Sequence, residues 1–130
     1  MKKVFCIFMV LIIISSVALA KNQYTDLANE HWGYEAVTKM SENEILSGYP
    51  DGTFLPNKAI TRAEFSKILV KSLDLNGKTI SFDDVDDKHW AKEYIAIAGN
   101  YLTSYNNGEK VLFMPDSSAI REAVASARSE

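Results

Sequence analysis

Three side chains in this sequence are of types that bind polar ligands, and each stands in a recognisable local pattern. Arg62 follows Thr61 in the first turn of a predicted helix. Its planar guanidinium can donate two parallel hydrogen bonds to a carboxylate, and free amides at a helix start also favour an anion. Asp26 could accept hydrogen bonds from sugar hydroxyls, and Trp32 could stack on a pyranose ring. These residue types suit the binding of anions and sugars. For them to form one site, the helices and loops of the fold must bring the three side chains together.

The remaining reactive residue types form no catalytic or metal-binding pattern. His31 and His89 each precede a tryptophan and lack a cluster of further ligands, so we expect them to help position a helix. The acidic run 83–87 fails the calcium-loop pattern, because positions six and twelve are Lys88 and Tyr94. The last aspartate of this run is expected to cap the helix that follows. The sequence contains no glycine-rich phosphate loop, zinc-ligand spacing or Ser/His/Asp signature, so we expect no enzyme activity, metal or cofactor.

The first twenty residues have the pattern of a secretory signal peptide. Lys2 and Lys3 precede an apolar run over residues 4–14, and Ala18 and Ala20 supply the small residues of a cleavage site. The alternative, an uncleaved membrane anchor, is disfavoured because a span needs about 20 apolar residues. The sole cysteine, Cys6, lies in this segment. The sequence therefore predicts a mature chain 21–130 without a disulfide, cysteine-ligated zinc, thiol nucleophile or lipoprotein anchor.

Composition and charge narrow the class of protein further. With 47% apolar and 24% charged residues in 130, the chain is neither collagen-like nor a coiled coil nor disordered. After removal of Lys2 and Lys3, 12 basic and 17 acidic side chains remain, a net charge of −5. This balance disfavours a general nucleic-acid binder or a binder of anionic membranes. Any anionic ligand must be held by local groups.

The chain contains an internal repeat that predicts two units, residues 21–78 and 79–130. Anchor residues recur after 56 to 59 positions, with small changes of spacing that suit loops. The matching pairs are Tyr24–Leu27 with Phe82–Val85, His31-Trp32 with His89-Trp90, Tyr49–Gly52 with Tyr105–Gly108, Phe54–Pro56 with Phe113–Pro115, and Arg62 with Arg121.

Each unit is predicted to be a helix, a tight loop and a second helix. The first helix is expected to begin just before Trp32 and to end at a left-handed Asn43. The predicted apolar faces are Trp32, Ala36, Val37 and Met40 in the first unit, and Trp90, Tyr94, Ile95 and Ala98 in the second.

The loop and the second helix carry clearer local signals. Residues 49–52 have the chemistry of a type I turn, with proline second and glycine fourth. Thr61 and Glu64 form a capping box, in which each side chain bonds the other residue's backbone amide. The predicted apolar face of this helix is Phe65, Ile68, Leu69 and Leu73, with Lys67 and Lys71 near its negative end.

These anchors, in this order, resemble the S-layer homology (SLH) domain. The segments 48–56 and 60–65 are long and specific matches. The second unit is degenerate: Ile120 replaces the threonine and Ala123 the glutamate of the capping box, whereas Arg121 is retained. The resemblance implies a mainly α fold of tandem helix-loop-helix SLH repeats, arranged as a partial pseudo-threefold bundle.

The resemblance also implies a function. Similar proteins are exported by bacteria and held at the cell wall, where grooves between repeats bind secondary cell-wall polysaccharide bearing pyruvate, or a modified peptidoglycan. Thr61 and Glu64 are expected to be structural. The glycan-binding candidates carried over by position are Asp26, Trp32, Gly48, Arg62, Asp84, Trp90 and Arg121.

Two alternatives remain beside a secreted, non-catalytic anchoring module. The chain could be an accessory or vestigial protein that packs with SLH repeats of other proteins, or the N-terminal piece of a larger S-layer protein or surface enzyme. With two repeats where the family has three, we expect weak self-association or binding to other SLH proteins, with fraying of the last helix. No nucleic-acid partner is expected, and no membrane contact after signal cleavage.

Overall fold

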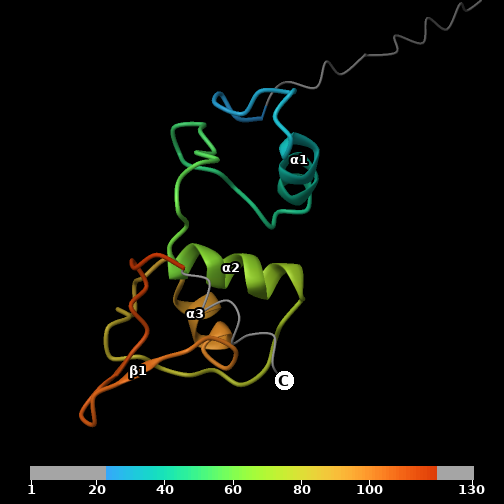
Figure 1. Cartoon of the computed structure of the whole chain (residues 1–130). Coiled ribbons are helices and arrows are strands. Elements are labelled where there is room, and N and C mark those ends of the chain that lie inside the picture. Colours follow the sequence, from blue (N-terminus) through green and yellow to red (C-terminus); the bar gives the residue numbers. More distant parts are fainter. Residues whose placement is uncertain (1–22, 120–130) are drawn as a thin grey trace, which may run out of the picture.

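A computed structural model describes residues 23–119, so the predicted signal peptide, Arg121 and the last predicted helix lie outside the described residues. The fold is mainly helical, as expected. Three helices, α1 (Tyr34–Glu42), α2 (Arg62–Ser72) and α3 (Lys92–Ala98), are followed by the antiparallel hairpin of β1 (Tyr105–Asn106) and β2 (Val111–Leu112) (Figure 1). Within residues 23–119, no helix has both the length and the apolar character needed to cross a membrane.

Helices α1 and α3 begin in the same way, which supports the internal repeat. The Nδ1 atom of His31 accepts a hydrogen bond of 3.1 Å from the amide of Gly33, and His89 does the same for Ala91. The helices therefore begin two residues after the tryptophans, and the predicted start before Trp32 is wrong. Trp32 is 94% exposed and Trp90 60% exposed, so neither belongs to an apolar face.

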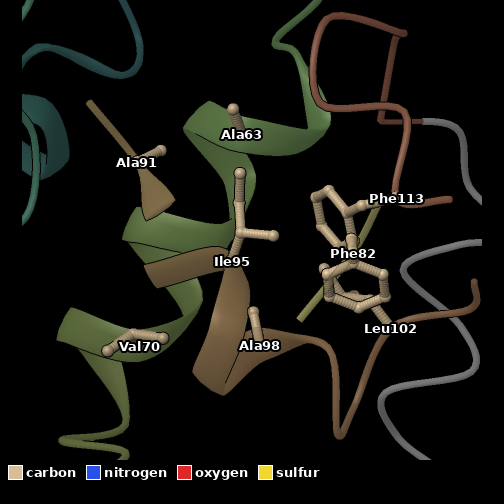
Figure 2. Packing of buried hydrophobic residues seen from close by; sticks show 8 residues of the cluster. All are labelled: Ala63, Val70, Phe82, Ala91, Ile95, Ala98, Leu102 and Phe113. Carbon is tan, nitrogen blue, oxygen red and sulfur yellow. The ribbon is translucent and has the colours of Figure 1, made fainter. Parts of the chain in front are cut away.

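The core lies between α2 and α3, which pack against each other (Figure 1). Its residues come from both sequence repeats: two from α2 of the first, and the rest from the second. Figure 2 shows the cluster, which consists of Ala63, Val70, Phe82, Ala91, Ile95, Ala98, Leu102 and Phe113.

The face that α2 buries differs from the predicted one. Ala63, Ser66 and Val70 are buried, whereas Leu73 is exposed. Small side chains at this face let α3 approach closely, and the larger Phe65 and Leu69 pack at its sides. The Ser66 hydroxyl is satisfied within the helix, because it donates a 2.8 Å hydrogen bond to the carbonyl of Arg62.

Helix α1 contributes no residue to this core cluster. Tyr24 and Leu27 are buried, and the Tyr24 hydroxyl lies 2.7 Å from the Ser41 hydroxyl of α1. Among the described residues, α1 packs against no other helix or strand (Figure 1). The predicted left-handed stop is also displaced by one residue, since Asn43 has φ −87° and Glu44 has φ 59°.

Candidate functional site

Asp26 and Asp84 occupy equivalent positions and bind the backbone of their own repeats. Each carboxylate accepts hydrogen bonds from two successive amides of the chain that returns from the loop. The distances are 2.7 Å and 2.7 Å from Asp26 to Phe54 and Leu55, and 2.8 Å and 2.6 Å from Asp84 to Phe113 and Met114. The bonds from Phe54 and Leu55 lower the pKa of Asp26. Both aspartates therefore have a structural role in fixing the loops.

Arg62 joins the two repeats. Its Nε donates a 2.8 Å hydrogen bond to the carbonyl of Phe113, and its Nη2 donates to the carbonyl of Thr103. The guanidinium carbon lies 4.5 Å from the centre of the Phe113 ring, and the residue is only 2% exposed. Burial lowers the pKa of this guanidinium. The arginine thus contacts the second repeat, and little of its surface is open to a ligand.

The start of α2 has no free amides in its first turn, contrary to the sequence-based expectation. The amides of Arg62 and Ala63 donate to the carbonyls of Ser117 and Pro115, at 2.8 Å and 2.9 Å. The amide of Glu64 donates to the Thr61 hydroxyl at 3.1 Å. Because these donors are already bonded, this helix start is not an anion site.

The capping box is complete and extends to the loop. The amide of Thr61 donates a 2.7 Å bond to Glu64 Oε2, and the hydroxyl of Tyr49 donates a 2.9 Å bond to Glu64 Oε1. Partial burial alone would raise the pKa of Glu64, but these bonds hold it below its usual value. Glu64 is therefore ionised at neutral pH and ties the turn at residues 49–52 to α2.

A groove of about 580 Å³ lies between the first-repeat loop, α2 and the indole of Trp90. Gly48 shapes its loop. With φ 61°, a side chain here would place its Cβ 2.3 Å from a Tyr24 ring carbon and 2.7 Å from the carbonyl oxygen of Thr53. Glycine is therefore required where the loop passes Tyr24. The groove brings Gly48 and Trp90, from different repeats, to one site.

Two lysines give this groove a positive character. Lys58 holds its Nζ 4.4 Å from the centre of the Tyr49 ring, and Lys67 donates a hydrogen bond to the Ser47 hydroxyl. Glu64 is the one acidic residue that lines the groove. Sequence reasoning missed both lysines, since Lys67 was assigned to the helix dipole and Lys58 to no role. The available signal was that both flank the capping box, within four residues of Thr61 or Glu64.

The other predicted glycan-binding residues are placed elsewhere. Asp26, Trp32, Arg62 and Asp84 do not line the groove, and Arg121 lies outside the described residues. Asp87 pairs with Lys92 and does not cap α3, whose start has no side-chain cap. Across residues 23–119, no group of three or more histidine, cysteine, aspartate or glutamate side chains could hold a metal ion.

A second hollow, of about 970 Å³, lies on the second repeat alone, between residues 79–90 and α3. Its charged residues are of both signs, and two of them, Asp87 and Lys92, already pair with each other. It therefore offers a ligand less unpaired charge than the groove at Trp90.

Comparison with known proteins shows which family part of this sequence matches. Residues 23–66 match the S-layer homology domain. Over 90 residues the chain is 39% identical to a cellulosome-anchoring protein of Acetivibrio thermocellus, covering 63% of this chain and 20% of that protein. Over 118 residues it is 32% identical to S-layer protein EA1 of Bacillus anthracis, covering 88% of this chain and 13% of that protein.

An endoglucanase of Bacillus sp. is 29% identical over 104 residues, which cover 78% of this chain and 11% of the enzyme. The chain thus spans a fifth or less of the length of these relatives. The alignment of 118 residues is longer than one repeat, so the similarity extends into the second, degenerate repeat.

Proposed function

We propose that this chain, which carries an S-layer homology domain at residues 23–66, is a non-catalytic module that attaches to the bacterial cell surface by binding cell-wall polysaccharide. The names of its relatives support this, since they include a cellulosome-anchoring protein and S-layer proteins. The enzymes among them match over a small fraction of their length, which suits a domain that is separate from the catalytic part.

The groove at Trp90 is the proposed binding site. An indole that is 60% exposed offers an apolar face for the C–H side of a sugar ring. Lys58 and Lys67 supply ammonium donors for a carboxylate, such as that of a pyruvyl group. Gly48 lets the loop that lines the groove pass close to Tyr24. The observation that carries the proposal is that one groove combines an indole of the second repeat with the glycine loop and lysines of the first.

Sedimentation of the purified protein with cell-wall sacculi tests the proposal, with sacculi used before and after chemical removal of their secondary polysaccharide. Trp90→Ala should weaken binding about tenfold, equivalent to about 1.4 kcal/mol. Trp32→Ala is the matched control, because Trp32 has the same local structure but does not line the groove.

The lysines are tested in the same assay. Lys67→Ala should weaken binding, whereas Lys71→Ala, one turn further along α2 and exposed, should not. Equal binding by the Trp90 and Trp32 variants would exclude the groove. Undiminished binding to sacculi that lack secondary polysaccharide would instead assign a peptidoglycan ligand.

A further inference from the structure

Several apolar residues on and after α1 are less buried than their equivalents on and after α3, although Tyr24 and Leu27 are as buried as Phe82 and Val85 or more so. In each of four pairs, the second-repeat residue is at most 5% exposed, and its first-repeat counterpart is half-buried. The pairs are Val37 with Ile95, Met40 with Ala98, Leu46 with Leu102, and Phe54 with Phe113. Because α1 and α3 begin in the same way, we attribute the difference in burial to what lies over each helix.

Helix α2 is the cover of the second repeat. Its Ala63 and Val70 belong to the core cluster with Ile95 and Ala98 (Figure 2). Phe65 packs against this cluster. The first repeat has no such cover within the described residues, because α1 packs against no helix. The surface formed by Val37, Met40 and Leu46, the α1 face, is the part of the first repeat that corresponds to the covered part of the second.

The segment after the described residues occupies the sequence position of α2 in the second repeat, but its residue types do not suit this role. At the positions that make the core contacts of α2, it has two charged residues, one serine and one valine. Ala63, Phe65, Leu69 and Val70 correspond to Glu122, Val124, Arg128 and Ser129. Because burying charged side chains without partners is costly, this segment would be a poor cover for the α1 face of this chain or of a second copy.

We propose that the α1 face docks an amphipathic helix from an S-layer homology repeat of another protein. The helix that fits has the sequence pattern of α2. It has a small residue in its first turn, as at Ala63, and an aromatic or large aliphatic residue two positions later, as at Phe65. Aliphatic residues follow six and seven positions after the small residue, as at Leu69 and Val70. The proposal does not depend on glycan binding. Val37 and Met40 do not line the groove, and Leu46 is the residue that the two surfaces share.

Docking would also create a second groove. Trp90 lines the present groove because α3 lies beside α2, which follows the loop of the preceding repeat. Trp32 precedes α1 in the same geometry, yet it is 94% exposed. A partner repeat seated on the α1 face would bring its own loop to Trp32. The chain would then extend the array of repeats of another surface protein by two.

The test uses a probe taken from this chain, a peptide with the sequence of residues 60–73. A side-chain cross-link between its positions 67 and 71, outside the buried face, keeps the peptide helical. The peptide then loses less conformational entropy when it binds. The peptide is titrated into the isotope-labelled full chain, and amide shifts are followed by NMR. We expect saturable shifts at Val37, Met40 and Leu46.

Two controls make the result specific. A peptide with Phe65→Asp and Leu69→Asp should bind at least tenfold more weakly. In the protein, Met40→Glu should weaken binding at least tenfold, whereas Lys39→Glu, an exposed neighbour in the same helix, should not. The α1 amide spectrum of each variant reports whether it remains folded. Absence of shifts at millimolar peptide, shifts confined to α3 and its core, or equal binding of both peptides would each overturn the proposal.

Discussion

At the scale of single residues, Asp26 and Asp84 show that an exposed carboxylate can have a structural role. Each holds two successive amides of a segment that contains a left-handed residue, Leu55 or Met114, with φ 55° and 60°. A left-handed conformation costs a non-glycine residue roughly 1–2 kcal/mol. Two charge-assisted hydrogen bonds offset that cost. The outer lone pairs of these oxygens remain available to solvent.

Asp26→Asn is expected to lower the melting temperature at pH 7, because an amide presents one acceptor oxygen where the carboxylate has two. The pKa of Asp26 is lowered in the folded state, so its contribution to stability is complete above the unfolded pKa. This contribution is lost as the pH falls below about 4. Thermal unfolding between pH 3 and pH 7 should therefore show a flatter pH dependence for the variant. Asp116→Asn, at an exposed aspartate, is the control, and the same slope in both variants would contradict the role of Asp26.

Arg62→Ala is expected to destabilise the fold by about 2 kcal/mol or more, because it leaves two carbonyls without donors and removes packing on Phe113. Arg62→Lys should recover little of this, since a single ammonium cannot replace the planar fork. Chemical denaturation measures the loss. If Arg62→Ala unfolds like the wild type but no longer binds sacculi, the arginine contacts the ligand, as the family resemblance implies.

The sequence identified Arg62 and Asp26 as unusual but did not reveal what they bind. Their partners are distant in sequence: 28 residues separate Asp26 from Phe54, and 51 separate Arg62 from Phe113. Residue type and local spacing carry no information on such contacts. The role of the tryptophans as ligand contacts remains a prediction, although their exposure was not expected from an apolar periodicity.

At the scale of elements, the features that were predicted correctly are those whose partners lie within four residues. The turn at residues 49–52 has its expected bond, 3.0 Å from the Gly52 amide to the Tyr49 carbonyl, and the capping box has both of its bonds. The expected role of His31 in positioning α1 is confirmed by its bond to the Gly33 amide, but this bond forms a turn before the helix, so the predicted start was two residues too early. The buried face of α2 was predicted in part: Phe65 and Leu69 pack against the core, but the small residues at the helix crossing, such as Ala63, were not expected there.

Thr61→Ala is expected to lower the free energy of unfolding by about 1 kcal/mol, the usual loss for an N-cap. The hydroxyl accepts the amide of Glu64, which would otherwise lack a partner in the first turn of α2. Urea denaturation followed by circular dichroism gives the value, with Thr103→Ala, at an exposed site outside any helix, as the control. Equal midpoints for the two variants would show that the cap contributes nothing.

At the scale of the whole molecule, the helices that pack together do not belong to the same sequence repeat. Helix α2 comes from the first repeat but covers the core of the second, and Arg62 donates hydrogen bonds to second-repeat carbonyls. The predicted sequence boundary at residues 78 and 79 remains a prediction, and the core cluster contains residues from both sides of it. A repeat in sequence therefore need not fold alone.

This arrangement predicts that α2 and α3 unfold together while α1 behaves separately. Ile95 has no exposed surface in the core, and Ile95→Ala should cost about 3 kcal/mol through lost transfer energy and a cavity. Native-state hydrogen exchange should then show equal losses of protection at the amides of α2 and α3, and little change at α1. Val37→Ala is the matched control. Because Val37 is the half-buried counterpart of Ile95 in α1, its truncation should cost less and affect α1 alone. If Ile95→Ala lowers protection in α3 but not in α2, the two repeats are separate folding units, and α2 is only a peripheral cover.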